Sequence, residues 1–332
     1  MSTPCVRAPV REGEATRAAL AERDLLDGDR EIEVEDGEIF VPVVDAAAAR
    51  EVGYEVAERE PAKRDGPTPP AEILGFEPSY ERLGDIVILD EDDPERARQI
   101  ADAIVESDVP CETVLNRASK VAGEYRVREW DVLHGDSTEA VHREYGHEFA
   151  LDVAEVYFSP RLATERHRIV EQVESGERVV DMFAGVGPFA VPMAARGAEV
   201  LACDVNPAAI RYLRANAERN GVADRITALE GDVRETTAEY DGWADRIVMN
   251  LPHSADEFLD TAVRLAGDDC VLHLYDMAHE DDPFGPGERA IREAAEPAGY
   301  EVEVVTRRDV RSYAPHELNV CLDVRIRRPS AA

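Results

Sequence analysis

Four polar side chains stand where predicted strands end, and together they suggest a site for an organic cofactor. Three are acids and one is an amide, found in four successive apolar runs: Asp181 in "RVVDMFAG", Asp204 in "AEVLACDV", Asp232 in "RITALEGD" and Asn250 in "DRIVMN". Because ligands of parallel α/β sheets bind outside the carboxyl ends of the strands, we expect these side chains at one rim. Asp204 lies 19 residues after Gly185, a position from which an acid can accept hydrogen bonds from both hydroxyls of a ribose.

The segment "GVG", from Gly185 to Gly187, follows the first of these strands. Two glycines let the backbone turn sharply and let a ligand come close. Asp232 is placed to accept from an adenine amino group. A dinucleotide site would need a third glycine where this chain has Phe189 and Ala190, and no basic residue waits for a phosphate. The residues favour S-adenosylmethionine, with a nicotinamide dinucleotide as the second choice, although each Asp alone could instead cap a helix.

The segment "NLPH" ends the fourth strand and is predicted to face the sulfonium methyl of that cofactor. The carbonyl of Asn250 and the backbone held by Pro252 can grip the edge of a base. The segment is a variant of the Asn-Pro-Pro-aromatic motif of methyltransferases that act on planar nitrogen, with Leu251 and His253 at the two positions that differ. A plain turn at a strand end also favours Asn and Pro, so this alternative stays open.

The elements that must position these residues alternate between strands and helices from about residue 160. The clearest helix has Asn206 as its N-cap, Pro207 at its first position and Gly221 past its end. Such alternation predicts an α/β fold with a mostly parallel, doubly wound sheet. The predicted strands are 178–185, 198–205, 225–232, 245–250 and 269–276, the helices are 188–197, 206–221 and 287–299, and a closing antiparallel pair is 300–310 with 317–327.

Two smaller α+β domains are expected before this region, which takes residues 151–332. Residues 1–58 read as a strand, a helix and a hairpin that turns at Asp36 and Gly37. Residues 59–80 hold five prolines and two glycines, a linker composition. Residues 81–150 form the middle domain, and the segments predicted there and running past its end are a helix at 93–107 and strands at 83–90, 112–119, 123–133 and 147–158.

The composition predicts a cytoplasmic protein of a salt-adapted cell. Asp and Glu total 71 against 37 Lys and Arg, a net charge of −34, and the acids are spread over the whole chain of 332 residues. Such a surface keeps a protein hydrated in molar salt, where the Debye length is ~3 Å and net charge no longer excludes nucleic acid. No apolar run reaches the roughly 18 residues of a membrane span, and the N-terminus lacks a signal core. The five scattered cysteines, without a CxxC pair, argue against disulfides and zinc.

The segments "EYRVREWD", "VYFSPRLATER", "VVDMFAGVGPF", "MNLPHSA" and "RSYAPHELNV" occur in this order. With them the chain resembles, over nearly its whole length, the archaeal and eukaryotic tRNA (guanine-N1) methyltransferases that modify guanosine 37, next to the anticodon. The resemblance implies a class I, Rossmann-like methyltransferase domain that uses S-adenosylmethionine, preceded by two small domains that engage the tRNA. It further implies that the N-terminal domain docks the tRNA away from the anticodon, and we expect a monomer.

The resemblance also implies roles for individual residues. Glu165 matches the general base, Arg126 matches the arginine that stabilises charge on guanine O6, and Asn250 and Pro252 match the motif that positions the base. Tyr157 is implied to lie near cofactor and base. The remaining implied cofactor contacts are Arg166, Asp204 with Val205, and Asp232 with Val233.

The chemistry of guanine explains these residue types. N1 carries a proton and becomes a good nucleophile only as that proton leaves and negative charge moves toward O6. A carboxylate that takes the proton and a cation that meets the oxygen are therefore complementary to the transition state. The methyl group on a sulfonium is already activated, so the mechanism requires no metal. Because N1 lies on the Watson–Crick edge, the base must be splayed out of its stack.

Plainer interpretations of the same residues remain. Glu165 follows Arg161 by four residues, the spacing of an ordinary ion pair on a helix. Arg126 and Arg128 alternate along a predicted strand, so one of them could face solvent, and Tyr157 could belong to the core. Other arginines are as suited to balancing nearby acids as to contacting phosphate: Arg307, Arg308, Arg311, Arg325, Arg327 and Arg328.

Rival functions are also open. Enzymes of wyosine biosynthesis use the same cofactor and fold but transfer its aminocarboxypropyl group, and bifunctional relatives also methylate a wyosine precursor. The presence of Glu165 and "NLP" favours methyl transfer. An acidic adaptor that keeps an inactive methyltransferase fold is the alternative from the binding class, and the complete set of rim residues argues against it.

Overall fold

The computed structural model describes residues 2–63, 68–120, 123 and 125–329, and the chain divides into two compact units. The first unit takes in Met1–Pro78 with Ala103–Val109, and the second takes in Ser79–Asp102 with Pro110–Ala332. Within the described residues, no helix has the length and apolar character that a membrane crossing requires. The predicted domain boundaries at residues 58, 80 and 150 stay predictions.

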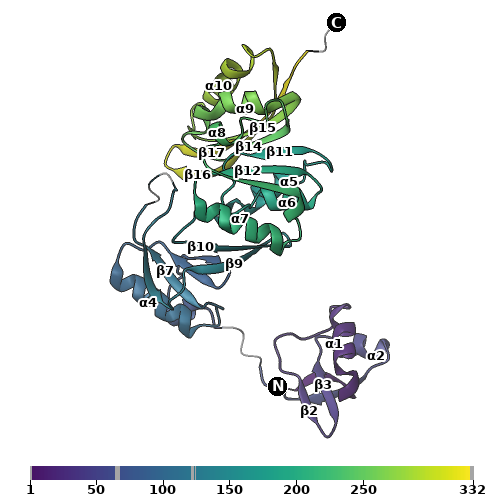
Figure 1. The fold of residues 1–332 in the computed structure, drawn as a ribbon. Helices are drawn as coiled ribbons and strands as arrows, with labels where there is room; N and C mark the ends of the chain where they lie inside the picture. Colours follow the sequence, from purple (N-terminus) through teal and green to yellow (C-terminus); the bar gives the residue numbers. More distant parts are fainter. Residues whose placement is uncertain (1, 64–67, 121–122, 124, 330–332) are drawn as a thin grey trace. The chain divides into compact units, whose positions relative to one another are not determined.

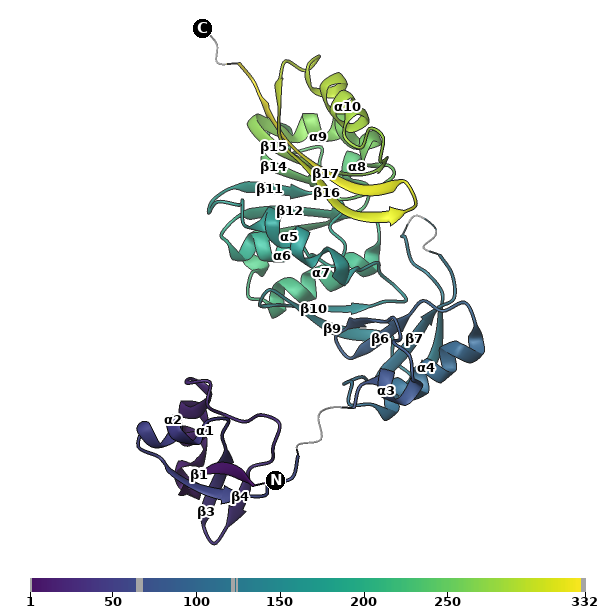
Figure 2. The same ribbon diagram turned by 180° about the vertical axis from the view of Figure 1, so that it is seen from behind.

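The first unit contains a four-stranded sheet in the order β2-β3-β1-β4, with β2 and β3 labelled in Figure 1 and β1, β3 and β4 in Figure 2. The hairpin predicted at 30–43 is present, and Asp36 and Gly37 both have positive φ (50° and 81°), as a two-residue turn between twisted strands requires. The helix α2 and strand β4 were not predicted, and a short helix lies in the predicted linker, of which 64–67 are outside the described residues. The elements are β1 (Thr3–Pro9), η1 (Val10–Glu12), α1 (Gly13–Ala21), β2 (Glu33–Glu35), β3 (Glu38–Pro42), α2 (Ala46–Glu51), β4 (Glu55–Arg59) and α3 (Pro70–Leu74).

A second four-stranded sheet, in the order β5-β6-β7-β8, begins the second unit. The strand predicted at 83–90 is present as β6 but starts only at Ile86, because Gly84, with φ +58°, turns the chain between β6 and the antiparallel β5, which was not predicted. The strand predicted at 123–133, of which residue 124 is not described, starts only at Trp130, and β9 was not predicted. The elements are β5 (Glu81–Leu83), β6 (Ile86–Leu89), α4 (Pro94–Glu106), β7 (Thr113–Arg117), β8 (Trp130–His134), β9 (Glu139–Glu144) and β10 (His147–Asp152), the last two forming their own ribbon.

The remainder of the second unit is the expected doubly wound domain, with a seven-stranded sheet in the order β13-β12-β11-β14-β15-β17-β16. The first five strands pair in parallel, and β17 pairs antiparallel with both β15 and β16. This confirms the predicted fold class. The strands are β11 (Arg178–Asp181), β12 (Glu199–Asp204), β13 (Ile226–Glu230), β14 (Ala244–Met249), β15 (Ala266–His279), β16 (Glu301–Ala314) and β17 (Glu317–Arg327).

Helices cover both faces of this sheet, α5 to α7 on one and α8 to α10 on the other (Figures 1 and 2). The division follows from the period of two along each strand: Val179 packs in one core cluster and Val180 in the other. Asn206 caps the helix predicted at 206–221 by accepting from Ala208 N at 2.9 Å. The helices are η2 (Pro160–Leu162), α5 (Ala163–Val170), α6 (Ala190–Ala195), α7 (Pro207–Arg219), η3 (Ala223–Arg225), α8 (Val233–Thr236), η4 (Ala255–Phe258), α9 (Leu259–Leu265) and α10 (Gly285–Ala295).

Candidate active site at the carboxyl rim of the sheet

Two side chains at the rim of β11 and β14, the buried Asp181 and the half-buried Asn250, have buried oxygens without side-chain partners. Asp181 is 0% exposed, and among the described residues neither of its carboxylate oxygens has a side-chain hydrogen-bond partner. Burial raises the pKa of Asp181 to about 7; the backbone N–H of Phe183 opposes this shift, and the nearby Asp204 adds to it. The buried Oδ1 of Asn250 is likewise unpartnered in the described chain. Asp181 is in register with Val248 on β14, and Asn250 follows that strand. The oxygens of Asp181 and Asn250 therefore lie on neighbouring strands at the same rim.

The glycine turn after β11 is fastened to β12 by Asp204. Gly185 N donates to Asp204 Oδ2 at 2.7 Å, and Asn206 N donates to Oδ1 at 2.9 Å. Gly187 has φ +91°, and a Cβ there would lie 3.2 Å from side-chain atoms of Leu213 and Val191, so this position favours glycine. Each oxygen of Asp204 has one donor and keeps capacity for a second, as binding of a ribose would require.

Asp232 has the capping role that was the plainer interpretation. Its Oδ1 accepts from Arg234 N at 2.8 Å at the start of α8, and the Arg234 guanidinium also binds the carboxylate. Hydrogen bonding from Arg234 lowers the pKa of Asp232 below its ordinary value. Val205 follows the end of β12, and the buried Val233 begins α8. A cofactor contact for these three residues stays a prediction.

Tyr157 and Arg166 differ in what they offer a ligand. The Tyr157 side chain is exposed, and its carbonyl oxygen lies 4.0 Å from where a Cβ on Gly185 would be, which places it beside the glycine turn. Arg166 is buried, binds Glu144 through two nitrogens at 2.8 and 2.5 Å, and donates to Ser159 O at 3.1 Å. These bonds use Nε and Nη2, so a cofactor contact through Nη1 would leave them in place.

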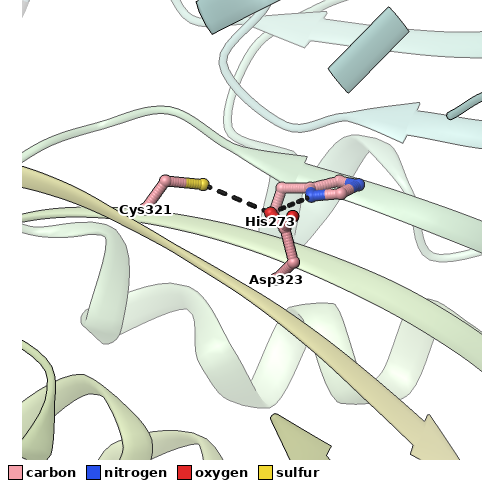
Figure 3. A group of neighbouring side chains, drawn as sticks. All are labelled: His273, Cys321 and Asp323. Carbon is pink, nitrogen blue, oxygen red and sulfur yellow. Dashed lines mark hydrogen bonds and ion pairs between the residues drawn. The ribbon is translucent and has the colours of Figure 1, made fainter. Parts of the chain in front are cut away.

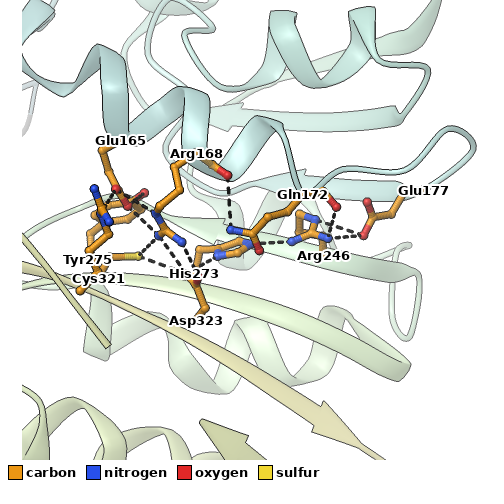
Figure 4. Close-up of polar contacts among 10 residues, drawn as sticks. Glu165, Arg168, Gln172, Glu177, Arg246, His273, Tyr275, Cys321 and Asp323 are labelled. Carbon is orange, nitrogen blue, oxygen red and sulfur yellow. Dashed lines mark hydrogen bonds and ion pairs between the residues drawn. The ribbon is translucent and has the colours of Figure 1, made fainter. Parts of the chain in front are cut away.

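Glu165 lies on α5 and points into a polar cluster beneath the helix (Figure 4). Arg168 donates to both carboxylate oxygens, at 2.7 and 2.9 Å, and the Tyr275 hydroxyl donates to Oε1 at 3.0 Å. Arg308 Nε lies 2.8 Å from Oε2. The alternative of a surface ion pair with Arg161 is wrong, because Glu165 is only 5% exposed and Arg161 pairs with Glu81 instead.

A buried chain of contacts continues from Arg168 across the sheet. Arg168 binds Asp323 on β17, and Asp323 Oδ1 lies 2.7 Å from Nδ1 of His273 on β15. His273 Nε2 lies 2.7 Å from Arg246 Nη1. Since arginine is always a donor, Nε2 accepts and Nδ1 carries the proton. Arg246 then pairs with Glu177 at 2.9 Å, which completes the row seen in Figure 4.

His273, Cys321 and Asp323 also lie within reach of one another as three possible metal ligands (Figure 3). Their contacts favour hydrogen bonding instead. Both ring nitrogens of His273 are occupied, and burial raises the pKa of the Cys321 thiol well above its ordinary value. Burial alone would raise the pKa of Asp323, but hydrogen bonds from His273 and Arg168 outweigh it and lower the pKa. Metal ligation by this trio would need a deprotonated thiol and release of the histidine.

Arg126 reaches the "NLPH" segment from the middle of the chain. Its Nη1 donates to Pro252 O at 2.9 Å. Arg126 has φ +54°, and this turn, not a strand, sets the direction of its side chain. The alternation of Arg126 and Arg128 along a strand is therefore wrong, since β8 begins only at Trp130.

The strand register brings the base-positioning and proton-accepting groups to one edge. Met249 of β14 is in register with Leu274 of β15, so Asn250 and Tyr275 follow at the same level. Tyr275 binds Glu165, and Arg126 binds the backbone just after Asn250. The sequence interpretation missed Arg168 as a partner of Glu165, although their spacing of three residues on a helix was a usable signal. It also missed the contacts that run from Arg168 to Arg246. The signal for them was the presence of Arg246 and Asp323 inside otherwise apolar strands.

Comparison with known proteins places the whole chain. Residues 140–304 match the TRM5/TYW2 methyltransferase domain, residues 68–138 the TYW2 N-terminal domain, and residues 5–51 the tRNA methyltransferase 5 N-terminal domain. The chain is 41% identical to the tRNA (guanine(37)-N(1))-methyltransferase Trm5b of Pyrococcus abyssi, with 98% of this chain and 99% of the relative covered. It is 34% identical to the tRNA(Phe) (4-demethylwyosine(37)-C(7)) aminocarboxypropyltransferase of Pyrococcus horikoshii, with 77% of this chain and 92% of the relative covered.

Solved structures give the same placement. A complex of aTrm5 and tRNALeu aligns with a TM-score of 0.71 at 33% identity, covering 97% of this chain and 99% of that one. Methanocaldococcus jannaschii TYW2 in complex with AdoMet aligns with a TM-score of 0.62 at 28% identity, covering 76% and 100%. With its fold, its rim residues and its full-length relatives in agreement, the chain belongs to the TRM5/TYW2 family of methyltransferases.

Proposed function

We propose that this protein transfers a methyl group from S-adenosylmethionine to N1 of guanosine 37 in tRNA. The observation that carries the proposal is the set of contacts at the adjoining ends of β14 and β15. Tyr275 of β15 donates to the buried Glu165 of α5, Asn250 follows β14 at the level of Tyr275, and Arg126 donates to Pro252 O, two residues after Asn250. A full-length relative with the same named activity supports it.

The rim fits the cofactor. The two unpartnered oxygens of Asp181 suit a cationic amino group, Asp204 suits a ribose, and Asp232 suits an adenine amino group, with Tyr157 exposed beside the glycine turn. When bound, S-adenosylmethionine supplies a methyl group that its sulfonium has already activated. The individual contacts of these side chains are part of the proposal.

The protein's own groups then act on the base. Asn250 offers a carbonyl without a partner in the described chain, and Pro252 fixes the backbone next to it, so together they hold the guanine edge. Glu165 accepts the proton of N1, and Arg126 meets the negative charge that develops on O6. Proton transfer to a positioned base is worth ~10²–10⁴-fold, and electrostatic stabilisation of the oxygen adds to it.

Mass spectrometry of a treated tRNA transcript tests the function. A transcript with guanosine at position 37 should gain the mass of one methyl group, and one with another base there should gain nothing. Gain of an aminocarboxypropyl group would instead support the wyosine-pathway alternative. That alternative is tested because a relative at 34% identity is an aminocarboxypropyltransferase. Methylation at another position would refute the proposal.

The N-terminal residues 1–58 are proposed to dock the tRNA away from the anticodon, supported by their match to the tRNA methyltransferase 5 N-terminal domain. Their removal should weaken tRNA binding and leave cofactor binding intact, and unchanged kinetics on full tRNA would refute this role. We further propose a monomer that works in the cytoplasm of a salt-adapted cell. Its net charge of −34 predicts activity that rises with potassium chloride into the molar range.

A further inference from the structure

The carboxylate of Glu165 accepts three hydrogen bonds and pairs with a further guanidinium before any substrate binds. A carboxylate offers about four lone-pair directions. Arg168 and Tyr275 contact Oε1, while Arg168 and Arg308 contact Oε2. A base that is to accept the N1 proton of guanine must first lose one of these contacts.

Arg308 is the contact that can leave most readily. Tyr275 is buried, and Arg168 is held on its other side by Asp323, at 2.5 and 3.1 Å. The Arg308 side chain is 45% exposed, and within the described chain Glu165 is its sole carboxylate partner. Loss of the Arg308 contact would expose Oε2 and leave the bidentate hold of Arg168 on Glu165 in place.

The surroundings of Arg308 suit an anion. It lies on β16, the edge strand of the sheet, between two register shifts at Val304/Thr306 and Asp309/Arg311, and such bulges redirect side chains at sheet edges. Arg311 forms no ion pair with a carboxylate among the residues that the structure describes. Burial, and then the nearby Arg311, lowers the pKa of Arg161, so a further guanidinium is close by. Arg161 itself is paired with Glu81, so Arg311 and Arg308 are the two cations here that a phosphate group could engage.

We propose that Arg308 is a substrate-binding residue that exchanges partners, leaving Glu165 for a backbone phosphate of the bound tRNA. The vacated position on Glu165 Oε2 then receives the N1–H of guanine. The proton passes from N1 to the carboxylate, and the lone pair left on N1 forms the new bond to the methyl carbon. This inference rests on the proposed function, because it takes Glu165 as the base and tRNA as the polyanion.

The first test is the salt dependence of tRNA binding by the full-length protein. Loss of one phosphate contact lowers the slope of log Kd against log salt by about one, so Arg308→Gln should show this decrease and Arg308→Lys should restore the slope. The matched control is Arg307→Gln, since Arg307 is adjacent on the same strand but pairs with Glu288 at 2.5 Å. Its slope should equal that of the unaltered protein.

The second test is the pH–rate profile, because kcat/KM reports the free enzyme and kcat the complex. Glu165 faces Arg168 on α5, Tyr275 on β15 and Arg308 on β16, and Cys321 on β17 lies nearby. Asp323 on β17 is bound to the other side of Arg168. The substitution Arg308→Gln removes only the Arg308 guanidinium and leaves the other groups around Glu165 in place. The cation that favours the carboxylate is lost only from the free enzyme, so the acid limb of kcat/KM should move to higher pH while that of kcat stays in place.

An unchanged salt slope together with a lower kcat would overturn the exchange and leave Arg308 as a fixed support of Glu165. Equal movement of both acid limbs would have the same meaning. Failure of the proposed function is seen separately, because the unaltered protein would then not methylate guanosine 37 in the same assays.

Discussion

Two aspartates in the same sheet, both almost wholly buried, have pKa values shifted in opposite directions. Asp181 on β11 has no side-chain partner among the described residues, and burial raises its pKa to about 7. Asp323 on β17 is bound by Arg168 and His273, whose hydrogen bonds outweigh burial and lower its pKa. Two carboxylates of similar burial therefore have pKa values shifted in opposite directions. The difference is that the protein supplies cationic and hydrogen-bonding side chains to Asp323 and not to Asp181.

The comparison separates two kinds of region in this molecule. Buried polar groups without partners are rare and costly, about 1–3 kcal/mol each, so the vacancies of Asp181 and Asn250 indicate atoms that a ligand supplies. The cluster around Glu165 and Asp323 is satisfied within the protein, as buried charges generally must be. The rim of β11 and β14 is therefore prepared for binding, and the cluster beneath α5 holds one side chain in place.

The largest expected effect comes from replacing the carboxylate that the cluster holds. Glu165→Gln should lower kcat by ~10²–10⁴-fold, since the amide cannot accept the N1 proton, while cofactor affinity by calorimetry stays close to that of the unaltered protein. Glu171→Gln is the matched control, because Glu171 follows α5 but is exposed and pairs with Arg196 at 2.7 Å. Near-normal turnover of Glu165→Gln would remove the base assignment.

Neutralising the paired aspartate should cause the largest loss of stability. Removal of one partner from a buried ion pair costs ~3–5 kcal/mol, so Asp323→Asn should lower the free energy of unfolding by about that amount in denaturant titrations. The control is Asp269→Asn, because Asp269 forms an exposed ion pair with Arg325. This substitution should change the free energy of unfolding by less than ~1 kcal/mol. Because its pKa is lowered in the folded state, the contribution of Asp323 is fully present above the ordinary carboxyl pKa and is lost as the pH falls from there through the lowered pKa of the folded state. Equal stability of the two variants would contradict the comparison.

Neutralising the unpaired aspartate should have the opposite sign. At pH 8 Asp181→Asn should make the cofactor-free protein more stable by roughly 1–3 kcal/mol, because it removes a buried charge without a side-chain partner, whose burial outweighs the backbone N–H of Phe183. A carboxyl whose pKa is raised to about 7 contributes stability at low pH that is lost as the pH rises through 7, and the variant should lack this slope. Cofactor affinity of the unaltered protein should fall below pH 7 as the carboxyl takes up a proton. A destabilised Asp181→Asn at pH 8 would show that the carboxylate has a partner inside the protein.

How much of this could be predicted from the sequence depends on how local each signal is. The helix after β12 was placed to within two residues, because Asn206, Pro207 and Gly221 mark its ends in the chain itself. The parallel sheet followed from alternation of strands and helices. The bond between Arg168 and Asp323 joins residues 155 positions apart, and no local pattern encodes it. The turn at Arg126 was hidden for another reason, since alternation of polar and apolar residues there imitates a strand.

Asp232 is the intermediate case, a rim acid that the protein already occupies, and it gives the smallest and most discriminating prediction. Serine is also a good N-cap, so Asp232→Ser should keep the start of α8 and change the unfolding free energy by less than ~0.5 kcal/mol. If the carboxylate also accepts from the adenine amino group, losing it should raise the Kd for the cofactor about fivefold, the worth of one hydrogen bond of ~1 kcal/mol. Calorimetry measures this directly. An unchanged Kd would show that Asp232, like Glu165 and Asp323, has its partners within the protein. Arg234 alone would then account for the position of the Asp232 carboxylate and for its lowered pKa.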